Sequence, residues 1–221
     1  CNAPGTNTDA VADLTMGLLL SCARRIPDYV IGTRNLEWKL SGKQMNLGGK
    51  TLGILGLGAI GRAVAVRAKA FGMKLLAYDP FLNEAFCREQ GIEATEMDDL
   101  IRRSDVITLH LPLLEETVHV INREKIEQMK DHVILINAAR GGLVDHEDLY
   151  QALTEGKLLA YGADVMEEEP PGDHPLFYLS NVYITPHAGA NTLEASENMM
   201  AVALTNALDL LEGKPCKNIV N

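Results

Sequence analysis

The spacing of apolar residues changes near residue 50, from a helical period to short strand-like runs. Between Asp9 and Arg24, apolar side chains recur at helical spacing over a wide face, which predicts a helix packed on several sides. Thr8 stands where a hydroxyl can cap this helix. Residues 26–49 have weaker periodicity and fit an arm or a plain surface loop, but Trp38, the only tryptophan, favours packing or an interface.

Beyond residue 50, short apolar runs alternate with helical segments. The predicted strands are Thr51–Leu55, Lys74–Tyr78, Val106–Leu109, Val133–Ile136, Leu159–Ala163 and Val182–Thr185. The predicted helices are Ala59–Phe71, Glu96–Arg103, His146–Gly156 and Thr192–Glu212. This alternation is typical of an α/β fold, a doubly wound parallel sheet of the Rossmann type with helices on both faces.

Composition and charge narrow the classes of protein. The 221 residues are 47% hydrophobic and 23% charged, which is ordinary for a globular domain. A net charge of −10 disfavours a nucleic-acid partner, because it repels phosphate, and is explained simply by solubility. No apolar run reaches the ~18 residues of a membrane span and no signal peptide is visible, so we expect no membrane partner and a cytoplasmic location.

The cysteines support a reducing compartment and argue against a metal site. They are far apart and lack the pairwise spacing of zinc ligands: Cys1, Cys22, Cys87 and Cys216. Cys22 falls on the apolar face of the first predicted helix, so we expect a buried thiol there.

A glycine-rich turn joins the first predicted strand to its helix. Gly56 permits a tight turn, Gly58 allows a pyrophosphate to approach the backbone, and Gly61 lets helix and strand pack closely. Asp79 ends the next strand, where an acid binds ribose hydroxyls and repels a 2′-phosphate, so NAD is favoured over NADP. The alternative is a glycine turn near an unrelated aspartate. The residues expected at the cofactor are Gly56, Gly58, Ala59, Ile60, Gly61 and Asp79.

Three later segments place polar residues at strand ends, where ligands bind in such sheets. They are 136–142, 164–171 and 185–190. The fork of Arg140 suits a carboxylate beside a ketone, and a histidine such as His187 can give a proton near neutral pH. Each also has an ordinary alternative: Arg140 as an ion pair, Glu169 as a solvated acid, and His187 as a cap of the final helix.

The motifs Asn-x-x-Arg-Gly, Glu-Pro and Pro-His, in this order, resemble the D-isomer-specific 2-hydroxyacid dehydrogenase family over almost the whole chain. The resemblance implies that Arg140 binds the substrate, that His187 is the catalytic acid/base and that Glu169 is its partner; Pro170 distinguishes Glu169 from Glu168. It places Asp164 near the nicotinamide carboxamide. The further cofactor contacts that it implies are His110, Pro112, Thr117, Ala138, Arg140, His187 and Gly189. The other histidines are expected to be structural or exposed: His119, His132, His146 and His174.

The resemblance implies an NAD-dependent oxidoreductase that interconverts a D-2-hydroxy acid and a 2-oxo acid by hydride transfer. Candidate substrates are 3-phosphoglycerate, glycerate or hydroxypyruvate, and glyoxylate. Phosphite oxidation stays open, whereas a glutamate at position 169 argues against formate dehydrogenases. The alternative is a non-catalytic, NAD(H)-sensing protein like the family's corepressors, which keep the same three catalytic residues.

The resemblance also predicts how the chain is divided. Residues 1–25 would be a connecting segment and interdomain helix, and 26–190 the NAD-binding domain with an interface arm at 26–49. Residues 191–221 would hold a helix that returns toward a substrate domain mostly absent from the chain. We therefore expect a chain that binds NAD but turns over poorly alone, and a homodimer formed through the first helix and the arm.

Overall fold

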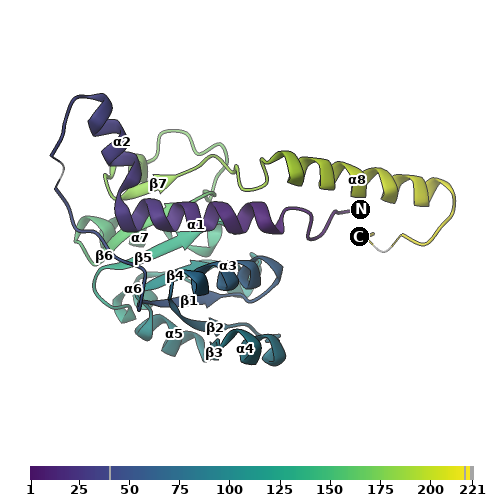
Figure 1. Ribbon diagram of the computed structural model, residues 1–221, viewed down its shortest axis with the longest axis horizontal. Coiled ribbons are helices and arrows are strands. Elements are labelled where there is room, and N and C mark those ends of the chain that lie inside the picture. The colour runs from purple at the N-terminus through teal and green to yellow at the C-terminus, as the bar shows by residue number, and fades with distance from the viewer. Residues whose placement is uncertain (40, 217, 220–221) are drawn as a thin grey trace.

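A seven-stranded sheet forms the centre of the computed structural model, which describes residues 1–39, 41–216 and 218–219 (Figure 1). Its strand order is β3-β2-β1-β4-β5-β6-β7, and every neighbouring pair is parallel. The strands are β1 Thr51–Leu55, β2 Lys74–Tyr78, β3 Glu93–Ala94, β4 Val106–Leu109, β5 Val133–Asn137, β6 Leu158–Ala163 and β7 Val182–Ile184. The fold is therefore the predicted doubly wound parallel sheet.

Helices cover both faces of the sheet. They are α1 Thr8–Arg24, α2 Ile26–Arg34, α3 Ala59–Ala70, α4 Glu84–Gln90, α5 Met97–Arg103, α6 Arg123–Gln128, α7 His146–Thr154 and α8 Leu193–Leu211, with 3₁₀ turns at Glu115–Thr117, Gly141–Leu143 and Pro175–Tyr178. One core joins α1, α3 and α4 to the first face, and a second joins α5, α6 and α7 to the other. The central strands, buried on both faces, are almost entirely apolar because neither side meets water, and Thr108 and Asn137 are their buried polar residues.

Strand order reverses between β1 and β4, and this reversal positions the site. From β1 the chain proceeds outward through β2 to β3, then returns to β4 on the other side of β1. The loops that leave β1 and β4 diverge to opposite faces, which opens a crevice at their carboxyl ends. Gly56 and His110 are the first residues of these two loops.

Helix α8 projects from the body of the molecule instead of covering the sheet (Figure 1). Its amino end is capped by Thr192, whose hydroxyl oxygen accepts a hydrogen bond from the backbone N–H of Ala195 at 3.1 Å. Beyond α8 the chain returns beside its first residues, since the Asn2 N–H donates to the Asn218 carbonyl at 2.9 Å. Asn206 of α8 also donates to the Asn2 carbonyl, at 3.0 Å.

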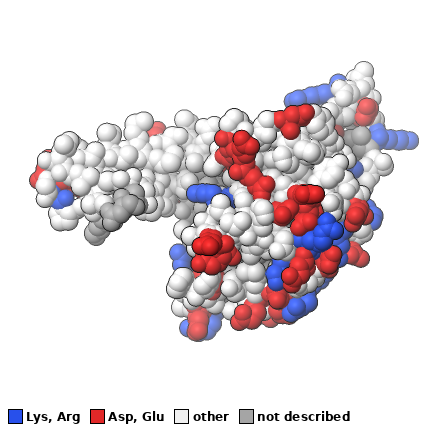
Figure 2. All heavy atoms as spheres, turned by 180° about the vertical axis from the view of Figure 1, so that it is seen from behind, with Lys and Arg blue, Asp and Glu red and all other residues white. Residues whose placement is uncertain are grey.

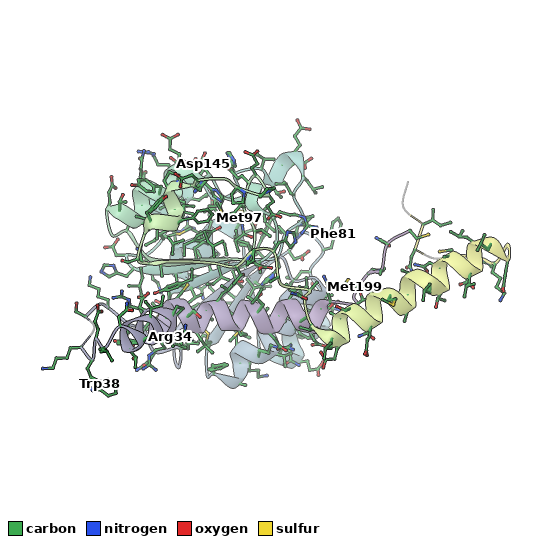
Figure 3. The ribbon with its side chains drawn as sticks, turned by 90° about the horizontal axis from the view of Figure 1, so that it is seen from above. Arg34, Trp38, Phe81, Met97, Asp145 and Met199 are labelled. Atoms are coloured by element: carbon green, nitrogen blue, oxygen red, sulfur yellow. The ribbon has the colours of Figure 1, made fainter. Side chains whose placement is uncertain are left out.

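Several local expectations need correction. The arm begins with a helix, α2, and Trp38 beyond it is 87% exposed and points away from the sheet (Figure 3), so it does not pack on this chain, and its place in an interface stays a prediction. Asn7, not Thr8, occupies the cap position of α1, and its side chain makes no capping hydrogen bond. The parts of the predicted arm and final segment at residues 40, 217, 220 and 221 lie outside the described residues.

Charge and apolarity are unevenly distributed. On the face shown in Figure 2, acidic side chains gather over the body, whereas the α8 projection is mostly uncharged. Among the residues that the structure describes, no helix combines the length and apolarity that crossing a bilayer requires.

Candidate active site

The glycine turn after β1 is built so that two positions admit no side chain. Gly56 has φ +97°, and a β-carbon there would lie 2.6 Å from the carbonyl of His110. A β-carbon at Gly61 would lie 2.1 Å from the Gly56 carbonyl oxygen. The turn can therefore be this tight, and α3 this close to β1, only with glycine at both positions.

The same turn fits the pyrophosphate of a dinucleotide. No atom lies within 4 Å of a β-carbon built on Gly58, the cap residue of α3. No side chain caps α3, so the N–H groups of its first turn, at Ala59 and Ile60, face open space with the favourable end of the helix dipole. Asp79 is fixed at the end of β2 by accepting hydrogen bonds from the N–H groups of Leu57, at 2.6 Å, and Phe81, at 2.8 Å.

A cavity of about 460 Å³ continues from this turn along the carboxyl ends of the central strands. The predicted site residues that line it are Ile60, His110, Pro112, Ala138, Arg140, Asp164, His187 and Gly189. Lining residues that sequence reasoning missed are Asn7, Val11, Leu111, Leu113, Ala139 and Ala190. Asn7 and Val11 come from α1, which precedes every nucleotide motif, so only the packing of α1 on the sheet reveals them.

His110 brings a buried neutral imidazole to the cavity. Its Nε2 atom lies 3.0 Å from the hydroxyl of Thr108, while Nδ1 is buried without a hydrogen-bond partner in the described structure. Burial lowers the pKa of His110 to about 4, so the ring is uncharged near neutral pH.

Thr117 is not brought to the cavity. Its hydroxyl donates to the Pro112 carbonyl at 2.7 Å and accepts from the Leu114 N–H at 2.7 Å. Thr117 therefore closes the loop after β4 on itself, and its side chain holds Pro112 in the cavity wall.

Arg140 follows β5 and is held by its backbone. The side chain of Asn137, fully buried at the end of β5, donates to the Arg140 carbonyl at 2.9 Å and accepts from the Ala139 N–H at 3.1 Å. Within the described part of the chain the Arg140 guanidinium forms no ion pair and donates only to the Ala139 carbonyl. Its fork can therefore bind a carboxylate that enters the cavity.

His187 and Glu169 form a hydrogen-bonded pair. His187 Nδ1 lies 2.6 Å from Glu169 Oε2, and the Met166 N–H donates to Oε1 at 2.9 Å. Burial alone raises the pKa of Glu169, but His187, the Met166 N–H and nearby Arg140 more than offset it, so this pKa is lowered. The Glu169 carboxylate thus stays ionised, fixes the His187 ring and leaves Nε2 of His187 free for a reactant. The neighbouring Glu168 is exposed.

Asp164 holds the loop that carries His187. It is 2% exposed, and its carboxylate accepts from the Thr185 hydroxyl at 2.5 Å and from the N–H groups of Ala188, at 2.8 Å, and Gly189, at 2.7 Å. These bonds support the left-handed backbone of His187, whose φ is 52°. Because Thr192 caps α8, His187 is not its cap.

Comparisons with known proteins agree with this geometry. Residues 16–189 match the family model described as D-isomer specific 2-hydroxyacid dehydrogenase, NAD binding domain. The chain is 46% identical to D-3-phosphoglycerate dehydrogenase of Methanocaldococcus jannaschii, covering all of this chain and 42% of that protein. It is 48% identical to hydroxypyruvate reductase of Thermotoga maritima, covering 90% of this chain and 65% of that protein.

Solved structures show the same likeness. D-lactate dehydrogenase from Aquifex aeolicus, complexed with NAD and lactic acid, aligns with a TM-score of 0.87 and 34% identity over 95% of this chain and 68% of that one. The chain thus spans about two thirds of that structure and less than half of the phosphoglycerate dehydrogenase.

The doubly wound sheet, the glycine turn and the strand-end acid define a dinucleotide-binding domain, and the side chains around its cavity suit a small carboxylic acid. More particularly, the chain belongs to the D-isomer specific 2-hydroxyacid dehydrogenase family and contains its NAD-binding domain. Its cofactor is therefore NAD.

Proposed function

We propose that this chain provides the cofactor-binding and catalytic residues of a dehydrogenase that interconverts a D-2-hydroxy acid and a 2-oxo acid. The observation that carries the proposal is the placement of Arg140 and the His187–Glu169 pair around one cavity beside the glycine turn. The names of the similar proteins, which include phosphoglycerate dehydrogenase and hydroxypyruvate and glyoxylate reductases, support this class of substrate.

The side chains have complementary tasks. Bound NAD(H) would supply or accept the hydride at the carbon that bears the oxygen. Arg140 would bind the carboxylate and polarise the adjacent carbonyl through its fork. His187 would give a proton from Nε2 to the carbonyl oxygen during reduction and take it back during oxidation. Glu169 would keep Nδ1 protonated and hold the ring in place.

The site is open on one side. The side chain of His187 is 55% exposed and Arg140 is exposed, so a carboxylate bound there would remain partly in water. Charge interactions weaken in water, and catalysis relies on their strength in a closed site. We therefore propose that the chain binds NAD but turns over slowly by itself.

The test is NADH oxidation by the complete gene product with a panel of 2-oxo acids, namely phosphohydroxypyruvate, hydroxypyruvate, glyoxylate and pyruvate. We expect a preference for one acid and a fall in kcat of about 100- to 10,000-fold in His187→Ala, because the proton donor is lost. NADH binding, followed by fluorescence, should persist in this variant, because the glycine turn and Asp79 are unchanged. Absence of turnover with every acid, despite tight NADH binding, would contradict the enzymatic proposal and favour an NAD(H)-sensing protein.

We also propose a homodimer in the cytoplasm. Exposed apolar side chains gather on α2 and the following arm: Ile26, Val30, Ile31, Leu36 and Trp38. Beside them a groove of about 700 Å³ lies between α1 and α2, lined in part by Leu20, Tyr29 and Val30. A contiguous apolar surface of this kind supports association with a second copy.

Buried, unpaired Cys22 and Cys87 support a reducing compartment.

A further inference from the structure

A histidine outside the cavity contacts three loops that carry site residues. His119 Nε2 lies 2.6 Å from Glu167 Oε1, and Nδ1 lies 3.3 Å from Asp145 Oδ2. The backbone N–H of His119 donates to the Gly142 carbonyl at 2.8 Å. His119 therefore joins the loop after β4 to the loop after β5 and to the loop after β6.

Each of these loops holds a predicted site residue. The loop of His119 also contains Pro112, and Gly142 lies two residues beyond Arg140. Glu167 lies two residues before Glu169. The N–H of Met166, in the same loop after β6, donates to the Glu169 carboxylate. A contact that fixes Glu167 therefore restrains the backbone that positions Glu169.

The loops after β5 and β6 already touch through their backbones. A β-carbon built on Gly141 would lie 2.0 Å from the carbonyl carbon of Met166 and 2.3 Å from the nitrogen of Glu167. This close approach fixes the distance between the two loops. It does not prevent one loop from sliding along the other, because glycine has no side chain that could lock them together. The His119 ring bridges the two loops at their edge and restricts that sliding.

A second histidine supports Glu167 from the interior. His146, which is 5% exposed, places Nδ1 3.8 Å from Glu167 Oε2, and its ring meets His174 edge to face with centroids 5.3 Å apart. Among the described residues, histidine, cysteine and acidic side chains form no group that could hold a metal ion. The cluster is thus organised around one carboxylate, that of Glu167, which hydrogen-bonds to His119 and lies near the buried ring of His146, whose nitrogens have no hydrogen-bond partner among the described residues.

The backbone of His119 shows how closely this position is constrained. Its φ is 49°, in the left-handed region that few residues other than glycine enter, although histidine enters it more often than most. His132 shares this conformation with φ 64°, but it precedes the amino end of β5, opposite the carboxyl ends that carry the site, and it contacts Lys43. His132 is therefore a matched control for any effect of the backbone conformation.

We propose that His119, through Glu167, is a positioning residue that holds Arg140 and the His187–Glu169 pair in register. The inference rests on the proposed function for its catalytic consequence, but its structural part stands independently. The side chains of His119 and Glu167 are 42% and 37% exposed. Their pair therefore stabilises the fold little and acts mainly on the geometry of the loops.

The first test follows the titration of Glu169 by carbon-13 NMR in this chain, with Glu169→Gln used to assign the signal. His119→Asn suits the left-handed backbone but is too short to reach Glu167. We expect it to raise the pKa of Glu169 toward the ordinary value, because the hydrogen bonds that lower this pKa lose their fixed geometry. His132→Asn should leave the titration unchanged. An unchanged titration in His119→Asn would overturn the proposal.

The second test uses the complete gene product and separates kcat from KM. His119→Asn should lower kcat up to about 100-fold, the effect of misplacing a catalytic group by about 1 Å, while the KM for NADH stays near that of the parent. His119→Gln, which is long enough to donate to Glu167, should restore most of the loss. Equal losses in the Asn and Gln variants would contradict a role through Glu167.

The proposed function and the positioning role of His119 can be contradicted independently of each other. A parent protein without turnover contradicts the proposed function, whereas the Glu169 titration still reports on His119. Turnover in the parent with wild-type kinetics in His119→Asn contradicts only the positioning role. Thermal unfolding by circular dichroism shows whether each variant is folded. Glu167→Gln, which keeps an acceptor oxygen, provides a second variant. We expect it to change the pKa of Glu169 and kcat in the same direction as His119→Asn, but less.

Discussion

At the scale of single residues, His110 shows how burial sets a charge state. Its ring lies in the cavity wall, and no carboxylate of the described structure pairs with it. Desolvation therefore dominates and lowers its pKa to about 4. A neutral ring can contact the uncharged adenine side of a nucleotide without the cost of a buried charge.

This burial predicts a dependence of stability on pH. The pKa of His110 is about 4 in the folded protein, against the ordinary histidine value of 6.5, so between these values only the unfolded chain binds the proton. The contribution is fully present above pH 6.5 and is lost as pH falls toward 4, by about 3 kcal/mol. Urea unfolding at several pH values measures it, and His110→Gln should show a smaller fall than the parent.

The comparison needs an exposed histidine that lies outside the cavity. His132→Gln removes an exposed histidine whose ring contacts Lys43, and should keep the parent's pH dependence. If His110→Gln and the parent lose stability equally between pH 7 and pH 4.5, the acid sensitivity arises elsewhere, for example in the carboxylate pairs.

Site residues differed in how far the sequence could predict them. Gly56, Gly61 and Asp79 could be predicted because a tight turn and a strand-end acid leave a local pattern. Arg140 and His187 could be placed because the carboxyl ends of parallel strands share one edge. Asn7 and the contacts of His119 depend on how distant segments pack, and no pattern in the neighbouring residues encodes that.

At the scale of elements, the packing of α1 on β6 depends on a missing side chain. A β-carbon at Gly162 would lie 2.9 Å from Cys22 Sγ and 2.9 Å from Ile136 Cδ1, and 3.3 Å from Leu18 Cβ. Helix and strand therefore approach more closely than alanine would allow. This explains how α1 buries Leu18 and Cys22 against a parallel sheet.

Gly162→Ala should lower the free energy of unfolding by about 1–3 kcal/mol, because the added methyl overpacks the interface between α1 and the sheet. Gly17→Ala is the matched control: this glycine lies on the exposed side of α1 with no atom within 4 Å of an added β-carbon. It should raise the free energy of unfolding by up to about 1 kcal/mol through helix propensity. Urea unfolding checks both, and a neutral Gly162→Ala would show that α1 is not so tightly packed.

Elements were predictable where burial dictates the pattern. The six longer strands were predicted to within one residue at either end, because they are mostly apolar and the inner ones are buried on both faces. Strand β3 was missed because it has two residues, both exposed, at the sheet edge. Helices α4 and α6 were missed because they are short and mostly polar, with one buried side chain each. Helix α2 left only Pro27 and Asp28 as signals of its start.

At the scale of the whole molecule, the proposed dimer makes a mass prediction. Light scattering should give about twice the chain mass of 24.1 kDa. Ile31 is 57% exposed on α2, and Ile31→Glu should reduce the mass to that of one chain, since a charge buried in an apolar interface is costly.

The projecting helix α8 supplies the control. Leu211 is 85% exposed at its far end, and Leu211→Glu introduces the same charge there. This variant should remain a dimer. A monomer in Leu211→Glu together with a dimer in Ile31→Glu would assign the interface to α8 instead.

Helix α1 precedes the whole sheet in the chain, yet it packs against β5, β6 and β7. Its partner at Gly162 follows Leu18 by about 140 residues. At the ~5–20 residues per second of ribosomal synthesis, α1 waits roughly 7–30 seconds for that strand to be made. Throughout this interval the apolar side of α1 that later packs on β6 has no strand to cover it. Although α1 precedes the sheet in the chain, its docking on these strands is therefore one of the later steps of folding during synthesis.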